Sequence, residues 1–306
     1  MHTWFNTILA NSLPFFPKVL VRRFASPYLA GEDAEEAIHC VRGLMEQGFV
    51  ATLDHLGEFV RWPDEADAAL AEYEGLLKAI EWAKVEANIS IKLSQLGLKL
   101  SANACYGRLI KLLHLANNVG QFVRIDMEDS PCTQATLDMY RSARKQEGLH
   151  NVGVVLQSRL RRTLKDAEQL CQAGIAHVRL CKGVYLEPRT LAYQDGELIR
   201  RNYLQTLEHL FAHQATVGIA THDERLIFEA QRLIQQYQVP PERVEFQMLL
   251  GVDPQLRRLT RSQGYRVRVY VPYGAHWHAY CMRRMRENPT LAFYVLKNIL
   301  QPATQP

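Results

Sequence analysis

Two arginines near the C-terminus stand beside a tyrosine and a glutamate at spacings that suit ligand binding. Tyr280, Arg283, Arg284 and Glu287 follow one another at i, i+3, i+4 and i+7, so on a helix they share one face. Two adjacent guanidinium groups match a planar anion, usually a carboxylate or a phosphate. Taken alone, the pattern is equally typical of an amphipathic helix with an Arg–Glu surface pair, so the position of this helix in the fold matters.

Polar residues also end a series of short β-branched segments. Burying ionisable groups there is costly unless they are paired or hold a ligand. Any one of them can simply solvate a rim, but that interpretation does not explain the whole set. In chain order the set is Glu58, Lys92, Asp126, Glu128, Gln157, Arg179, Lys182, Tyr185, Thr221, His222, Asp223 and Tyr270.

Three other interpretations of these residues stay open. His222 and the HWH sequence of His276 and His278 suggest a metal site, but no carboxylate or second histidine stands at a familiar ligand spacing, so we expect no metal. Lys92 and Lys182 can form Schiff bases, which makes an aldolase-type barrel the alternative enzyme. The third hypothesis is a catalytically silent barrel that acts as a binding or scaffold protein, although every expected polar position is filled.

The elements that position these residues alternate regularly along the chain. Short β-branched runs followed by amphipathic stretches, such as 66–87 and 224–239, indicate parallel strands with crossover helices. Gly148, Gly174 and Gly264 stand where helix C-caps are expected. The eight predicted strands cover residues 49–58, 90–97, 122–129, 152–159, 176–185, 217–223, 244–251 and 265–274.

Eight consecutive units favour an α/β fold of the closed (βα)₈ TIM-barrel type, with residues 49–306 as the barrel domain. An open doubly wound sheet that held a dinucleotide would need a GxGxxG fingerprint after a strand, and the sequence has none. Residues 1–48 are predicted to form an N-terminal helical arm or cap. In such barrels the chemistry lies at the C-terminal ends of the strands, where the polar set gathers and where the last helix begins.

The eighth predicted strand alternates in a way that separates two sets of side chains. Val267, Val269 and Val271 fall on one face, whereas Arg268 and Tyr270 fall on the other.

Bulk composition excludes several classes of protein. The formal charge of the 306 residues is +4, with basic and acidic residues interleaved, so no nucleic-acid partner is expected. The six cysteines form no CxxC pair, which is typical of reduced thiols in a cytosolic protein. Pro14 and Pro17 interrupt the apolar N-terminal stretch, and no segment is long enough to span a bilayer. We therefore expect a cytoplasmic protein, at most peripheral on a membrane surface.

The sequence resembles the proline dehydrogenase family, in its short single-function bacterial form. KGxY or THD alone would be weak evidence, but together with YxxRRxxE the set is specific. The blocks lie in order between residues 54 and 287: DHLGE, SIKLSQLG, VRIDMED, VVLQSRL, VRLCKGVY, ATHDERL, EFQMLLG, VRVYVPYG and YCMRRMRE.

This resemblance implies a distorted (βα)₈ barrel that holds FAD at the strand C-termini without a Rossmann fold. It implies that Lys92, Arg283 and Arg284 bind the carboxylate of the substrate, while Tyr280 and Glu287 orient that helix face. Asp126 and Arg179 would be the catalytic residues, with Arg179 approaching flavin N5. Glu58 would be a gate residue that pairs with Arg283 when substrate is absent.

The remaining implied contacts fall into two groups. Tyr185, Leu249 and Tyr270 would wall the proline ring. The FAD contacts would be Met127, Gln157, Arg179, Lys182, Gly183, Val184, Thr221 and His222. Val184 departs from the family, which often has alanine at this position, and because its contribution is expected from the backbone we expect little effect.

The activity implied by the resemblance is oxidation of L-proline to Δ1-pyrroline-5-carboxylate, the first step of proline catabolism to glutamate. A hydride would pass from proline C5 to flavin N5, and a membrane quinone would then accept the electrons. The enzyme would thus be a flavoprotein oxidoreductase acting on a CH–NH group, with the chain peripheral on the inner face of the bacterial membrane. The sequence itself shows no quinone motif.

Overall fold

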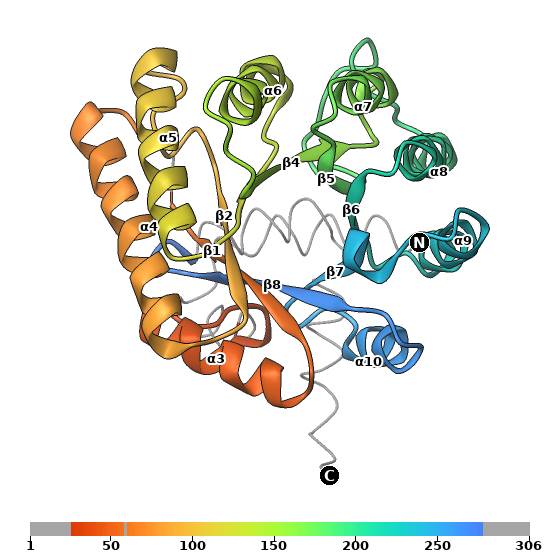
Figure 1. Ribbon diagram of the computed structural model, residues 1–306, viewed down its shortest axis with the longest axis horizontal. Coiled ribbons are helices and arrows are strands. Elements are labelled where there is room, and N and C mark those ends of the chain that lie inside the picture. The colour runs from red at the N-terminus through yellow and green to blue at the C-terminus, as the bar shows by residue number, and fades with distance from the viewer. Residues whose placement is uncertain (1–25, 58–59, 278–306) are drawn as a thin grey trace, which may run out of the picture.

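The architecture is a closed barrel of eight parallel strands, as Figure 1 shows in a view down the ring. The computed structural model describes residues 26–57 and 60–277. The strands pair in chain order, and the last pairs with the first. Their bounds are β1 (Val50–His55), β2 (Ala87–Ile91), β3 (Val123–Ile125), β4 (Val152–Gln157), β5 (His177–Cys181), β6 (Thr216–Ala220), β7 (Val244–Leu249) and β8 (Val267–Tyr273).

Helices surround this ring of strands (Figure 1). One α-helix follows each of the first seven strands, which confirms the predicted (βα)₈ class. The α-helices are α3 (Ala34–Glu46), α4 (Pro63–Ala83), α5 (Ala102–Asn118), α6 (Ser130–Lys145), α7 (Thr163–Gln172), α8 (Gly196–Ala212), α9 (Glu224–Gln236) and α10 (Pro254–Ser262). Two short 3₁₀ helices, η2 (Ser26–Tyr28) and η3 (Pro241–Arg243), complete the described elements.

Helix α3 precedes the barrel in sequence yet forms part of its wall. It contacts β1, β8 and α4, so it covers the seam where the sheet closes. Its apolar face, which includes Ile38, Val41 and Leu44, is buried in the common core. The division of the chain into an arm of residues 1–48 and a barrel of residues 49–306 stays a prediction, because most of residues 1–33 lie outside the described part.

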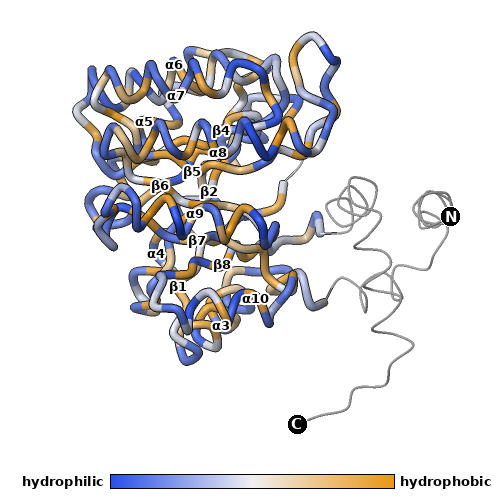
Figure 2. Tube along the Cα trace, turned by 90° about the vertical axis from the view of Figure 1, so that its right-hand side faces the viewer, coloured by the Kyte–Doolittle hydropathy of each residue, from blue (hydrophilic) through white to orange (hydrophobic). Residues whose placement is uncertain are grey.

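The strands are buried on both faces, but the two faces differ in chemistry. Residues such as Leu53, Ile89 and Val123 belong to the core between the sheet and the helices. Figure 2 shows hydrophobic colour along the strands and mixed colour along the outer helices. Burial of apolar surface in this layer stabilises the fold by about 25 cal/mol per Å². Because the stabilisation comes from outside the ring of strands, the inside of the barrel can hold polar side chains.

The interior of the barrel carries polar side chains. Arg124, Arg179 and Arg268 are all buried, and they alternate with the outward-facing valines, isoleucines and leucines of their strands. The predicted alternation in β8 is confirmed, since Arg268 bonds inside the barrel to Glu245 of the neighbouring β7, while Val267, Val269 and Val271 belong to the apolar core.

Two glycines make room for these long side chains. A Cβ built on Gly153 would lie 2.3 Å from Arg124 Nη1 and 2.8 Å from the backbone oxygen of His177. A Cβ on Gly218 would lie 2.3 Å from Gln247 Nε2. The absence of a side chain at these two positions therefore lets the Arg124 guanidinium pass over β4 and the Gln247 amide pass over β6.

Each predicted strand overlaps an observed one, but all eight observed strands are shorter than predicted and β2 is displaced toward the N-terminus. β2 covers 87–91 rather than 90–97, because the backbone N–H of Gln95 donates to the oxygen of Lys92 (3.1 Å) and turns the chain at once. β5 ends at Cys181 rather than 185, since Gly183 takes a positive φ of 92° that no ladder accommodates. Gly174 and Gly264 follow the C-caps of α7 and α10 with φ of 68° and 90°, as expected.

Two further expectations concern membrane spans and the last helix. Among the residues that the structure describes, no helix is both long and apolar enough to cross a membrane. The helix expected after β8 lies outside the described residues, as does Glu58.

We predict that Gly153→Ala destabilises the protein, because the new methyl group would press on Arg124 and on a backbone carbonyl that cannot move away. Overpacking of this kind costs about 1–3 kcal/mol of unfolding free energy. Urea unfolding measures it. The control is Gly107→Ala on α5, where the added methyl group meets nothing within 4 Å and should stabilise by about 0.5–1 kcal/mol. A Gly153→Ala protein as stable as the parent would contradict the account of the interior.

Candidate active site

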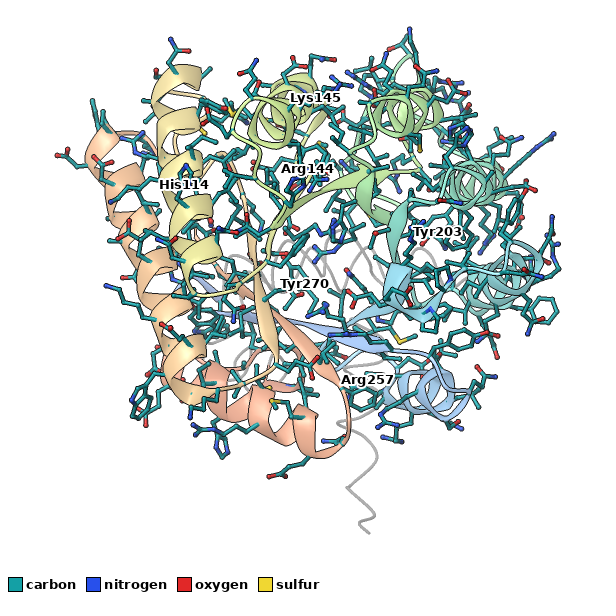
Figure 3. All side chains as sticks on the ribbon, in the orientation of Figure 1. His114, Arg144, Lys145, Tyr203, Arg257 and Tyr270 are labelled. Carbon is teal, nitrogen blue, oxygen red and sulfur yellow. The ribbon has the colours of Figure 1, made fainter. Side chains whose placement is uncertain are left out.

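Asp126 is the centre of a network at the C-terminal mouth of the barrel. It follows β3, and its Oδ1 accepts a hydrogen bond of 2.6 Å from Arg179 Nη1 on β5. Its Oδ2 accepts one of 2.7 Å from the hydroxyl of Tyr270 on β8. Because these three elements do not neighbour one another in the sheet, the contacts run across the barrel, where Figure 3 shows Tyr270 inside the ring.

Lys92 joins the same network from the end of β2. Its Nζ lies 2.7 Å from Asp54 Oδ1 and 3.6 Å from Asp126 Oδ2. Asp54 is only 1% exposed, whereas the Lys92 side chain is 19% exposed. The ammonium group therefore sits at the boundary between a buried carboxylate and the mouth.

Arg179 is held in place by further partners below Asp126. Its Nη2 donates to Ser90 Oγ at 3.1 Å, and its Nε donates to Gln247 Oε1. The guanidinium also lies over the ring of Tyr270, 5.2 Å from the ring centroid, a distance that suits a cation–π contact. These contacts fix the orientation of Arg179.

The electrostatics of the network favour an ionised Asp126 beside a protonated Lys92. Burial alone would raise the pKa of Asp126, but Arg179 and Lys92 lower it below its usual value. Burial alone would lower the pKa of Lys92, and the carboxylates of Asp54 and Asp126 raise it instead. Burial, together with the charge of Asp126, raises the pKa of Tyr270, so its hydroxyl stays protonated and donates.

A second polar layer supports this network from below. Gln247 Nε2 donates to Glu245 Oε1 at 2.7 Å, and the same oxygen accepts from Arg268 Nε at 2.6 Å. Arg268 also donates to the backbone oxygen of Ala51 at 2.6 Å. A continuous chain of hydrogen bonds thus runs from Arg179 through Gln247 and Glu245 to Arg268.

Two further ion pairs, which share the carboxylate of Asp223, lie on the rim beyond β5 and β6. Asp223 accepts hydrogen bonds from Lys182 Nζ and, at 2.6 Å, from Arg200 Nε. The same carboxylate accepts from the backbone N–H of Arg225 and caps α9. Burial opposes the charge on Asp223, but its hydrogen bonds to Lys182 and Arg200 lower its pKa to about 2.

The turn after β5 packs closely on the end of β4. A Cβ on Gly183 would lie 2.7 Å from Gln157 Oε1, so the backbone of this turn runs directly against the Gln157 amide. Gln157 Nε2 donates to the backbone oxygen of Glu128 at 2.9 Å. Val184 is exposed and Tyr185 is half-buried at the same turn.

The other predicted contact residues occupy the remaining strand ends. His222 Nε2 accepts a hydrogen bond of 3.0 Å from the backbone N–H of Leu249, which ties the ends of β6 and β7 together. Thr221 is buried, and its hydroxyl accepts from the backbone N–H of Asp223 at 3.0 Å. Met127 is buried and belongs to the apolar core.

Glu128 has a structural environment of its own. Its carboxylate accepts from the backbone N–H of Ser94 at 2.9 Å and from the Ser94 hydroxyl. Burial raises its pKa, and these bonds partly oppose the rise. Glu128 therefore joins the loops after β2 and β3 instead of meeting Asp126.

The structure brings Lys92, Asp126, Arg179 and Tyr270 together, as the strand-end pattern predicts. Their assigned roles, like those of the rim residues, stay predictions. Five predicted site residues lie outside the described residues: Glu58, Tyr280, Arg283, Arg284 and Glu287.

Sequence reasoning missed the residues that support the network. Asp54, Ser90, Gln247 and Glu245 were not singled out, although the period-two alternation of a strand carries the signal. Asp54 stands two residues after Thr52, and Ser90 stands two residues before Lys92. Reading each strand inward from its polar end would have identified them.

The mouth as a whole is suited to a small zwitterionic or anionic ligand. It holds fixed cationic donors beside a tyrosine ring, and each donor is oriented by a buried acceptor below it. Preorganised charges of this kind recognise a carboxylate with little reorganisation.

Comparisons with known proteins agree on one family. A family model described as "Proline dehydrogenase" matches residues 37–293. The proline dehydrogenase of Deinococcus radiodurans is 36% identical over 281 residues, covering 90% of both chains. Proline dehydrogenase 1 of Bacillus subtilis is 34% identical over 277 residues, covering 90% of this chain and 91% of the relative.

The fold also matches a solved structure. Proline utilization A from Bdellovibrio bacteriovorus, inactivated by N-propargylglycine, superposes with a TM-score of 0.81 at 23% identity. The match covers 87% of this chain and 33% of that one. At this identity it supports the fold alone.

We predict that Asp223→Asn weakens the acid sensitivity of folding. A carboxylate whose pKa is depressed stabilises the fold above its ordinary value near 4 and loses that contribution as the pH falls toward the depressed value near 2. The variant should therefore be less stable than the parent at pH 6, and its urea midpoint should fall less between pH 5 and pH 3. Asp64→Asn, an exposed position on the first turn of α4, is the control. Equal acid-induced losses in parent and Asp223→Asn would contradict this assignment.

Proposed function

Because this chain belongs to the proline dehydrogenase family, and is thereby an enzyme of proline oxidation and proline catabolism, we propose that it oxidises L-proline with FAD. The product would be Δ1-pyrroline-5-carboxylate, the first intermediate on the way to glutamate. The observation that carries this proposal is the network of Lys92, Asp126, Arg179 and Tyr270 across the mouth of the barrel.

Lys92 is the proposed anchor of the substrate carboxylate within the described residues. An ammonium group has three N–H donors, and Asp54 and Asp126 face only part of it. Its partial exposure leaves a direction open toward the mouth. Arg283 and Arg284 are proposed to complete the carboxylate site, with Glu287 and Tyr280 orienting them, and Glu58 is proposed to pair with Arg283 when substrate is absent.

Tyr270 is proposed to contact the ring of proline, together with Leu249 and Tyr185. Its hydroxyl is engaged by Asp126, so the ring is held in one orientation inside the mouth. A fixed aromatic wall presents one face of the substrate ring for reaction and aligns its C5 hydrogen.

The strand ends fit a flavin nucleotide. The Gly183 turn leaves no room for a side chain, which brings the backbone of Lys182–Val184 close to any ligand beside Gln157. Lys182 and Arg200 are 37% and 30% exposed on this rim and offer cationic donors suited to phosphate groups. We propose that Met127, Gln157, Lys182, Gly183, Val184, Thr221 and His222 hold FAD, with Arg179 near its reactive ring.

When bound, FAD would supply the acceptor for the hydride that leaves proline C5. The amine nitrogen would lose its proton to water, so that a C=N bond forms between N and C5. Within the chain, Arg179 and Lys92 hold positive charge over the site, and Asp126 keeps both oriented. A membrane quinone is the proposed final electron acceptor, with the chain peripheral on the inner face of the bacterial membrane; the family alone supports this step.

The Schiff-base alternative is disfavoured by the surroundings of both lysines. A lysine nucleophile must be neutral, whereas the carboxylates of Asp54 and Asp126 more than offset burial and raise the pKa of Lys92. Lys182 is bound to Asp223. Neither amine is activated for attack on a carbonyl.

The test of the proposed function is the absorbance of the purified chain. An oxidised flavin absorbs at about 450 nm, and anaerobic addition of L-proline should bleach this band. Glycine, which has no ring, serves as the control. A colourless protein that is trapped on a carbonyl substrate by borohydride would instead support the Schiff-base enzyme.

Arg284→Met should keep the flavin but lose affinity for proline. Loss of one charge-assisted contact costs about 1.5–3 kcal/mol, which corresponds to a KM at least tenfold higher. Steady-state kinetics with the flavin content measured in parallel tests this expectation. Arg232→Met, an exposed arginine on α9, is the matched control. Unchanged proline kinetics in Arg284→Met would remove the residue from the carboxylate site.

Tyr270 should set the selectivity for the substrate ring. A tyrosine ring against proline leaves no space for a hydroxyl group, so trans-4-hydroxyproline should be a poor substrate. Tyr270→Ser should reduce the preference for proline over trans-4-hydroxyproline, mainly by lowering kcat/KM for proline itself. Tyr270→Phe keeps the ring and should keep the preference, even though it removes the bond to Asp126. If the ratio of kcat/KM for proline to kcat/KM for trans-4-hydroxyproline were the same in the parent and in Tyr270→Ser, Tyr270 would lie away from the substrate ring.

A further inference from the structure

Three potential metal ligands meet on the outside of the barrel. Cys171 lies in the last turn of α7, and His209 and His213 lie at the end of α8, four residues apart. Their ligand atoms all lie within 4.8 Å of one another. Helices α7 and α8 pack against each other, and their C-terminal ends return to the barrel face opposite the catalytic mouth.

His213 is oriented as a ligand should be. Its Nδ1 lies 2.9 Å from the backbone oxygen of His209. Since a carbonyl oxygen only accepts, Nδ1 carries the proton and donates, which leaves Nε2 of the neutral ring with a free lone pair. Histidines that bind metals show this arrangement, because the hydrogen bond fixes both the tautomer and the ring orientation.

His209 has a nitrogen that the described residues do not satisfy. Its Nε2 is buried and has no hydrogen-bond partner among them. The ring stacks on that of His213 with centroids 4.1 Å apart and an interplanar angle of 29°. A buried polar atom without a partner is costly, and nothing in the folding of α8 accounts for it.

The spacing of the three groups suits a tetrahedral ion. With Zn–N of about 2.1 Å and Zn–S of about 2.3 Å, ligand atoms in a tetrahedral site lie about 3.5 Å apart. Bringing the ligand atoms together from 4.8 Å requires them to move by about 1 Å through side-chain rotation, which the half-buried Cys171 and the exposed His213 permit. Thiolate and imidazole together select zinc over magnesium or calcium.

We propose that Cys171, His209 and His213 form a zinc-binding site that ties α7 to α8. A water molecule would supply the fourth ligand of a tetrahedral ion. Binding would displace the thiol proton of Cys171 into solvent. From the sequence we expect no metal at His222, His276 or His278, and that expectation did not consider His209 and His213 at the end of α8.

The experiment is a zinc titration of the full-length flavoprotein after treatment with a chelator. Zn²⁺ should bind one equivalent per chain in competition with a chromogenic chelator, and at a hundredfold excess over Kd it should raise the melting temperature by about 4 °C. Mg²⁺ at the same concentration should do neither. Cys171→Ser and His213→Gln should each weaken zinc binding at least tenfold, while their proline kinetics match those of the parent.

Matched controls separate this cluster from other cysteines and histidines. Cys40 is half-buried on α3, and His114 is exposed on α5, on the other side of the barrel from α8 (Figure 3). Cys40→Ser and His114→Gln should bind zinc like the parent. Co²⁺ should give a thiolate charge-transfer band in the parent that disappears in Cys171→Ser. Equal zinc affinity and stoichiometry in all four variants, or a cobalt spectrum unchanged by Cys171→Ser, would overturn the proposal.

Discussion

The carboxylate of Asp126 is the contact on which the mouth of this barrel depends. It accepts hydrogen bonds from Arg179 and Tyr270 and faces Lys92, so it joins side chains from three other strands, β2, β5 and β8. A buried guanidinium that lacked a counter-charge would be strongly destabilising. Asp126 therefore stabilises Arg179 in a position where it also serves as an oriented cationic donor.

The rest of the interior follows from the need to satisfy Arg179. Arg179 also donates hydrogen bonds to Ser90 and Gln247. Gln247 donates to the carboxylate of Glu245, which also accepts from Arg268. The glycine at position 218 leaves the space that Gln247 occupies. Because the apolar stabilisation is concentrated between the strands and the outer helices, the barrel can hold this polar column without losing its core.

The sequence predicts this arrangement unevenly, for physical reasons. The eight units follow from the alternation of β-branched runs and amphipathic stretches, which is a local signal. This alternation does not show where β2 and β5 end, because their ends depend on the turn after Lys92 and on the positive φ of Gly183. Lys92, Asp126 and Arg179 were predicted from their place at strand ends, whereas their support by Asp54 and Gln247 depends on which side chains meet across the ring. The pairing of Cys171 with His209 depends likewise on two helices packing together.

A double-mutant cycle on Asp126 and Arg179 tests the central claim most directly. Asp126→Asn, Arg179→Gln and the double variant are compared by urea unfolding, with Asp126→Asn and Arg232→Gln as the reference pair. If the two side chains stabilise one another, the double variant loses less than the sum of the single losses, by more than about 1.5 kcal/mol. The reference pair should be additive within about 0.5 kcal/mol, because Arg232 pairs with Glu229 on the surface of α9 and shares no partner with Asp126. Additive losses for Asp126 and Arg179 would contradict the account.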